Sequence, residues 1–140
     1  MFGRILVAFD GSEGSRIALT RSIELAKALG AELASISVEE HLPYYAASLS
    51  EVKGTQERID QHFEALTKQA RDLAALSGIR LETLVQQGHE IERIVEAAEG
   101  GRFDLLVIGY HGHSRIFERT MGSTAQAIVR HAPCPVLVAK

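Results

Sequence analysis

Residues 105–124 read LLVIGYHGHSRIFERTMGST, and this stretch decides the fold. Its first four residues, LLVI, form a continuous apolar run, which is typical of a strand buried on both faces of a parallel sheet. A polar, glycine-punctuated segment follows, and apolar residues then recur at helical spacing at Ala125, Ile128 and Val129. The pattern therefore predicts a buried strand, a loop and a helix that begins near Ser123.

The loop between this strand and this helix has the residues of an anion site. Its glycines are Gly109, Gly112 and Gly122, and the hydroxyl residues Ser123 and Thr124 follow directly. Glycine lets the backbone turn sharply and approach a ligand closely. The first N–H groups of a helix have no partner within the helix and lie at the positive end of its dipole. We therefore interpret residues 109–124 as a phosphate-binding loop at the carboxyl end of a central strand.

Apolar runs and helical periods alternate along the rest of the chain. Strands are predicted at residues 5–9, 33–38, 80–86 and 136–139, in addition to 105–109. Helices are predicted between Ser12 and Gly30, from residue 59 to residue 78, at 91–100 and at 125–131, whereas residues 39–54 have no clear period and are expected to form a loop. This alternation indicates an α/β fold: a single-domain, doubly wound, five-stranded parallel sheet over residues 1–140, with helices on both faces.

The ligand site of such a sheet lies outside the carboxyl ends of its strands. Four residues directly end or follow predicted strands: Asp10, Val38, Gly88 and Gly109. We expect them to converge at one edge of the sheet, beside the glycine loop.

The composition is that of an ordinary globular protein. Hydrophobic residues make up 46% and charged residues 24%, and the net charge of −3 gives no case for nucleic acid as a partner. No apolar run is long enough to span a membrane, and the first residues lack the features of a signal peptide. The single cysteine, Cys134, excludes an internal disulfide and is consistent with a reducing compartment, so a cytoplasmic location is expected.

The spacing Gly109-x2-Gly112-x9-Gly122-Ser123 resembles the nucleotide-binding signature of the universal stress protein family, in its ATP-binding branch. The resemblance covers the whole chain. It includes the opening ILVAFDGSEGSRIALTRSIELAKALGAEL, the turn Gly88-His89-x-Ile91 and the closing HAPCPVLVAK. It implies the strand order 3-2-1-4-5, similar to the adenine-nucleotide alpha-hydrolase-like folds.

The resemblance also implies a site for ATP, with or without Mg²⁺. Asp10 would contact the ribose or the base, Val38 would meet adenine through its backbone, and Ala8 and Phe9 would flank the base. The phosphates would be held by residues of the loop: Gly109, His111, Gly112, His113, Ser114, Arg115, Gly122, Ser123 and Thr124.

Relatives in this family commonly dimerise by pairing their last strands antiparallel. The resemblance therefore implies a homodimer. The pairing residues would be Val136, Leu137, Val138 and Ala139.

Several of these residues have a second interpretation. Asp10 follows a strand and would then cap the next helix. His111 and His113, with His89 near them, have the side chains of a zinc site, but no cysteine or carboxylate cluster accompanies them, so no metal site is expected. Arg115 would pair with a phosphate or face solvent.

Two further side chains bear on the site. Cys134 lies between two prolines and before an apolar strand, and is expected to be a small buried hydrophobe. Tyr110 stands where relatives commonly have a small hydroxylated residue, so its ring would crowd a ligand or stack on it.

The residues favour binding over turnover. The sequence has no Gly-Lys-Ser/Thr triplet, no lysine lies in the loop, and no base is evident beside Ser123. The expected function is that of a cytoplasmic ATP-binding stress-response or regulatory protein without catalytic residues. The alternatives are a slow ATPase or autophosphorylating enzyme with Ser123 or Thr124 as acceptor, a nucleotide-free interaction module of the same fold, and another ligand of this pocket, such as a cyclic nucleotide.

Overall fold

The computed structural model describes the backbone of residues 1–40, 49–111 and 120–140, and the side chains of these residues except 49–52. In chain order the elements are β1 (Arg4–Ala8), α1 (Glu13–Leu29), β2 (Glu32–Glu39), α2 (Leu49–Leu76), β3 (Leu81–Gln87), α3 (Glu90–Gly100), β4 (Leu105–Gly109), α4 (Ser123–His131) and β5 (Val136–Ala139). The strands are parallel and form a sheet in the order β3-β2-β1-β4-β5. The predicted doubly wound five-stranded α/β fold is confirmed.

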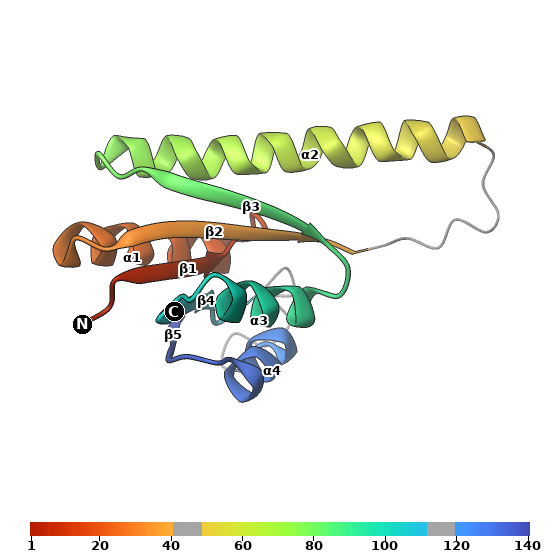
Figure 1. Ribbon diagram of the computed structural model, residues 1–140. Helices are drawn as coiled ribbons and strands as arrows, with labels where there is room; N and C mark the ends of the chain where they lie inside the picture. The colour runs from red at the N-terminus through yellow and green to blue at the C-terminus, as the bar shows by residue number, and fades with distance from the viewer. Residues whose placement is uncertain (41–48, 112–119) are drawn as a thin grey trace.

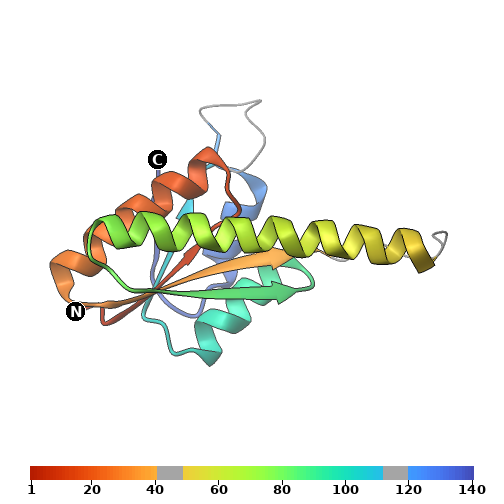
Figure 2. The same cartoon turned by 90° about the horizontal axis from the view of Figure 1, so that it is seen from above.

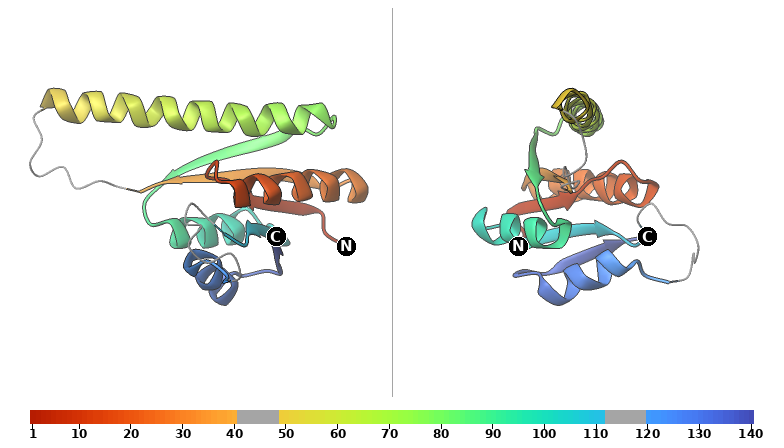
Figure 3. Two further views of the ribbon diagram at one scale, coloured as in Figure 1. Left: turned by 180° about the vertical axis from the view of Figure 1, so that it is seen from behind. Right: turned by 90° about the vertical axis from the view of Figure 1, so that its right-hand side faces the viewer.

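Helices cover both faces of the sheet, with α1 and α2 on one face and α3 and α4 on the other (Figures 1 and 3). The central strand β1 shows why both faces need a cover. Ile5 and Val7 are fully buried in the core under α1 and α2, whereas Leu6, between them, is fully buried in the core under α3 and α4. Successive side chains of a strand point to opposite faces, so a continuous apolar run requires two cores.

Helix α1 begins and ends where the sequence predicts. The Ser12 hydroxyl accepts a hydrogen bond from the backbone N–H of Ser15 at 3.2 Å, and the Ser15 hydroxyl donates to the Ser12 carbonyl at 2.9 Å. At the other end Gly30 has a φ of 65°, and its N–H donates to the carbonyl of Ala26. A serine N-cap and a left-handed glycine thus bound the helix.

Helix α2 is longer than the periodicity predicts. It begins at Leu49 rather than near residue 59, so the prediction of a loop over residues 39–54 is wrong at its C-terminal end, and residues 41–48 lie outside the described residues. Leu66, Ala70 and Ala74 pack the second half of α2 into the core. Extending a helix that already exists avoids the cost of nucleating a new one, and the first half continues past the carboxyl ends of β2 and β3 (Figure 2). Among the described residues no helix, α2 included, is long and apolar enough to cross a membrane.

The strand ends also differ slightly from the prediction. β2 continues to Glu39, which pairs with Gln87 at the end of β3. The buried Glu39 carboxylate accepts hydrogen bonds from the side-chain amides of Gln87 at 3.4 Å and Gln56 at 3.5 Å. A charged residue interrupts the apolar pattern, so the alternation of side chains does not reveal that the strand includes it.

Asp104 joins the amino ends of β1 and β4. Its carboxylate accepts hydrogen bonds from the backbone N–H groups of Gly3 at 2.8 Å and Arg4 at 3.0 Å, and its own N–H donates to the Arg4 carbonyl at 3.0 Å. The N–H groups of Gly3 and then Arg4 stabilise the charged carboxylate and hold the pKa of Asp104 below its usual value of 3.8.

We expect Asp104→Asn to lower the free energy of unfolding at neutral pH, by an amount that depends on pH. Because the pKa of Asp104 is lower in the folded state, its contribution is fully present above the unfolded-state pKa and is lost as the pH falls through the folded-state pKa. Urea unfolding of both proteins between about pH 6 and pH 3 should show the difference shrinking in acid. Asp72→Asn is the control, since it removes the same charge from an exposed pair with Lys68; a difference for Asp104→Asn that is independent of pH would contradict the account.

Candidate functional site

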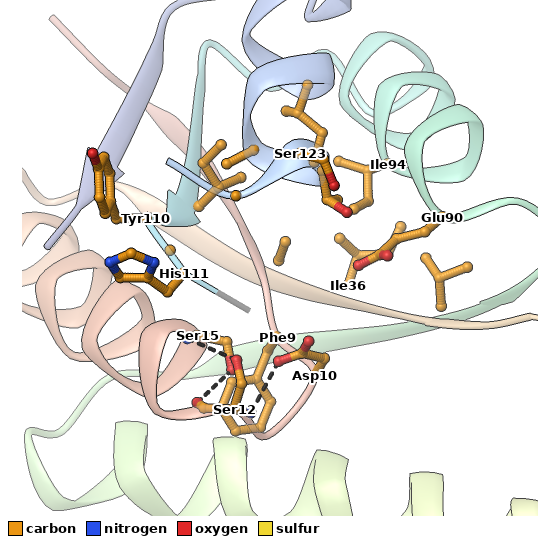
Figure 4. Close-up of a pocket in the computed structure, with 18 residues that line it drawn as sticks. Phe9, Asp10, Ser12, Ser15, Ile36, Glu90, Ile94, Tyr110, His111 and Ser123 are labelled. Atoms are coloured by element: carbon orange, nitrogen blue, oxygen red, sulfur yellow. Dashed lines mark hydrogen bonds between the residues drawn. The ribbon is translucent and has the colours of Figure 1, made fainter. Parts of the chain in front are cut away.

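A cavity opens at the carboxyl ends of β1, β2 and β4, on the face that α3 and α4 cover (Figure 4). Its volume is about 260 Å³, near the lower end of the range for small-molecule pockets. Apolar side chains of the core under α3 and α4 line it: Ile36, Val38, Ile94, Ile108, Ala125 and Ile128. Polar residues also line it: Asp10, Ser12, Ser15, Glu90, His111, Ser123 and Thr124. An apolar pocket with a few polar groups is the usual form of a site for a small organic ligand.

Every predicted site residue that the structure describes lines this cavity. These residues are Ala8, Phe9, Asp10, Val38, Gly109, His111, Gly122, Ser123 and Thr124. The other predicted residues, Gly112, His113, Ser114 and Arg115, lie outside the described residues. Residues that are far apart in the sequence thus meet at one edge of the sheet, as the topology requires.

Backbone hydrogen bonds bring the start of α4 back to the end of β4. Tyr110 donates its N–H to the carbonyl of Ala139 at 2.8 Å, which continues the pairing of β4 with β5 by one residue. Gly122 donates its N–H to the carbonyl of Tyr110 at 3.0 Å. The side-chain amide of Gln126 then donates to the carbonyl of Met121 at 2.8 Å. The chain therefore leaves β4 and enters α4 at nearly the same point.

The N-terminus of α4 lies at the cavity and is capped by a glycine. Gly122, Ser123, Thr124 and Ala125 all line the cavity. Gly122 has no side chain, and no side-chain hydrogen bond caps this helix end among the described residues. The hydroxyl of Ser12, by contrast, caps the N-terminus of α1. The positive end of the α4 dipole, with the two hydroxyl residues, is suited to an anion.

Asp10 has a structural role and also lines the cavity. Its Oδ1 accepts a hydrogen bond from the backbone N–H of Ser12 at 2.9 Å, which stabilises the turn between β1 and α1. Figure 4 shows the side chain beside the cavity. A carboxylate has about four acceptor sites, so Asp10 can accept a hydrogen bond from a ligand in addition to its contacts within the protein.

Phe9 lines the cavity, but its ring belongs to the other face of the sheet. The ring is buried in the core under α1 and α2, with Leu66 among its members. Its backbone is held by the next strand: Phe9 donates its N–H to the Ile36 carbonyl at 2.9 Å and accepts from the Ser37 hydroxyl at 2.7 Å. Two residues are expected to flank the base. Ala8 packs against the core under α3 and α4, on the cavity side of the sheet, whereas the Phe9 side chain packs in the core under α1 and α2, on the opposite side.

Gly109 packs closely against α1, and this contact explains why residue 109 is a glycine. A Cβ at Gly109 would lie 2.6 Å from the carbonyl carbon of Gly14, in the first turn of α1. A Cβ at Gly14 would lie 1.9 Å from the carbonyl oxygen of His111. Two glycines therefore let α1 and the end of β4 touch backbone to backbone, and the sequence prediction missed Gly14.

Tyr110 and His111, which directly follow β4, pack on each other. Their rings meet edge to face with centroids 4.6 Å apart, and the Lys140 ammonium lies 4.9 Å from the centre of the Tyr110 ring. The Tyr110 ring thus has partners within the protein. The described residues contain no group of three or more His, Cys, Asp or Glu side chains that could hold a metal.

Cys134 is half-buried rather than buried. Burial, and then the negative charge of Asp104, raise the pKa of its thiol. The nucleophilic thiolate is therefore disfavoured at neutral pH.

The comparisons with known proteins agree with this fold. The model of the universal stress protein family matches residues 1–140. The chain belongs to this family. A universal stress protein of Thermus aquaticus is 33% identical over 141 residues, which are 100% of each chain. The universal stress protein UspA from Lactobacillus plantarum has a TM-score of 0.85 at 26% identity, covering 99% of this chain and 98% of that one. A universal stress protein in complex with cAMP has a TM-score of 0.72 at 26% identity, covering 99% and 97%.

In this universal stress protein the cavity has a further acidic residue that the sequence prediction missed. Glu90, the first residue of α3, lines the cavity. In the sequence it resembles the acidic residues that commonly occupy the first turn of a helix, so nothing marks it as a site residue. Only the placement of α3 over the end of β2 brings it to the cavity.

We expect Gly109→Ala to destabilise the fold by about 1–3 kcal/mol, because the new methyl group would overlap backbone atoms that cannot move aside. Gly100→Ala is the control. A Cβ at Gly100, the last residue of α3, meets nothing within 4 Å, so this change should be neutral or slightly stabilising. Thermal and urea unfolding measure both variants, and a Gly109→Ala protein as stable as the parent would show that α1 does not pack directly on β4.

Proposed function

We propose that this protein binds an adenine nucleotide, with ATP as the principal ligand, in the cavity at the carboxyl ends of its strands. The observation that carries the proposal is the N-terminus of α4, capped by Gly122, at the wall of a cavity lined by apolar side chains. A helix N-terminus suits a phosphate, and an apolar cavity wall suits a flat base. The relative in complex with cAMP, 26% identical over nearly the whole chain, supports a nucleotide in this fold.

The proposed ligand runs along the edge of the sheet from α4 to β2. Its phosphates lie at Gly122, Ser123 and Thr124, and its base lies over Ile36 and Val38. Asp10, which follows the strand between these two ends, is placed to accept hydrogen bonds from the ribose. This direction puts the anionic part of the ligand at the positive end of the α4 dipole.

The loop residues complete the proposed phosphate site. His111 lines the cavity. Gly112, His113, Ser114 and Arg115 lie outside the described residues and are proposed as phosphate ligands because of their place between β4 and α4. Mg²⁺ is proposed to arrive with the triphosphate.

We propose that the protein works by binding rather than by turnover, as a cytoplasmic stress-response or regulatory protein. Its proposed form is a homodimer that pairs β5 with β5 of a second copy. β5 is an edge strand of the sheet, and Val136, Leu137 and Val138 are half-buried within one chain. An unpaired edge with apolar side chains is a template for a second strand.

The first experiment identifies the ligand directly. Freshly purified protein is denatured, released small molecules are identified by mass spectrometry, and nucleotide-free protein is titrated with ATP, ADP, AMP and cAMP by calorimetry. We expect one ATP per chain, with release of inorganic phosphate at the background rate. An empty extract together with no heat on titration with any of the four would contradict the proposal, and steady phosphate release would contradict binding without turnover.

We expect Ser123→Asp to weaken ATP binding at least about ten-fold without loss of stability. The new carboxylate repels the phosphates, because like charges placed together cost several kcal/mol. The same carboxylate in the first turn of α4 interacts favourably with the helix dipole. Calorimetry and thermal unfolding measure the two effects separately. Gln61→Glu adds the same charge at an exposed position of α2 and should leave the affinity unchanged; unchanged affinity in Ser123→Asp would place the phosphates elsewhere.

A further inference from the structure

Glu90 places a carboxylate at the wall of the cavity. It is the first residue of α3. Two residues before it lies Gly88, which has a φ of 132° and stands where the chain turns from β3 to α3. Figure 4 shows its side chain beside Ile36 and Ile94, directed toward the cavity. α3 packs against the core that includes Ile36, so its first turn stands over the carboxyl end of β2.

Two regions of the cavity differ in their side chains. The α4 end has the positive end of a helix dipole and two hydroxyl residues. The β2 end has the Glu90 carboxylate among apolar side chains, Ile36 and Ile94. A phosphate beside Glu90 would meet a like charge, whereas the base of the proposed ligand, which lies over Ile36, would be next to Glu90.

A carboxylate accepts hydrogen bonds and donates none when it is ionised. The positive end of the α3 dipole interacts favourably with a carboxylate in the first turn of the helix. A carboxylate has about four acceptor sites, so Glu90 can accept a hydrogen bond from a ligand in addition to its contacts within the protein. Glu90 is half-buried, so a ligand acceptor facing its carboxylate would displace water without a hydrogen bond in return, which costs binding free energy.

We propose that Glu90 determines the base specificity of the site, by accepting a hydrogen bond from an amino group on the base and disfavouring a base that has a carbonyl oxygen there. The amino group of adenine is such a donor. Hypoxanthine, the base of ITP, has a carbonyl oxygen in the same place and would set two acceptors against each other. This inference rests on the proposed nucleotide function, and it names the residue that selects the base.

The test compares the dissociation constants of ATP and ITP, measured by calorimetry for the parent protein and for Glu90→Gln. A glutamine amide both donates and accepts, so it can pair with the amino group or with the carbonyl oxygen. The parent should prefer ATP over ITP by about ten-fold or more, since hydrogen bonds to charged groups are among the stronger ones. In Glu90→Gln the ratio should fall below about three-fold, chiefly because ITP binds more tightly.

Glu92→Gln is the matched control. It removes the same charge from the same turn of α3, at an exposed position that does not line the cavity, and should keep the ratio of the parent. A parent that binds ATP and ITP equally, or a Glu90→Gln protein that keeps the full preference, would overturn the role of Glu90 and leave the proposed function standing. A parent that binds neither nucleotide would overturn both.

Discussion

The cavity depends on a direct contact between two pieces of backbone, Gly14 in the first turn of α1 and Gly109 at the end of β4. No side chain lies between them, so α1 can start close to the end of β4. Hydrogen bonds from Tyr110 to Ala139 and from Gly122 to Tyr110 then hold the end of β4 and the start of α4 together. The N-termini of α1, α3 and α4 lie around the carboxyl ends of the strands. The N-terminus of α1 is capped by Ser12. Neither α3 nor α4 has a side-chain cap, but the first turn of α3 carries Glu90 and Glu92, whereas the first turn of α4 has no acidic residue. This difference between the helix ends makes α4 the proposed phosphate site.

The fold could be predicted from the sequence because its signals are local and repeated. In β1 and β4 a continuous apolar run marks burial on both faces, and the chain confirms this with Leu6 in one core and Ile5 in the other. Ser12 and Gly30 mark the ends of α1 in the same local way. The start of α2 could not be predicted, because its first half extends past the sheet and none of its residues 53–62 is buried, so no apolar period is imposed on them.

The candidate site was predicted in part. Parallel strands bring their carboxyl ends together, so residues after strands, such as Asp10 and Val38, could be placed at the cavity from topology alone. The roles of glycines and helix residues depend on contacts between distant segments. Gly109 is required by Gly14, Phe9 faces the opposite core, and Glu90 reaches the cavity through the packing of α3. None of these three facts has a signal within its own stretch of sequence.

The proposed adenine nucleotide binds with its phosphates at the N-terminus of α4. The most direct test is a titration of nitrogen-15-labelled protein with ATP, followed through the backbone amide resonances of Ser123 and Thr124. We expect large shifts of these amides that saturate at one ATP per chain, with AMP producing smaller shifts there because it has fewer phosphates. Saturable binding that leaves these amides unshifted would contradict the account, since it would place the phosphates away from α4.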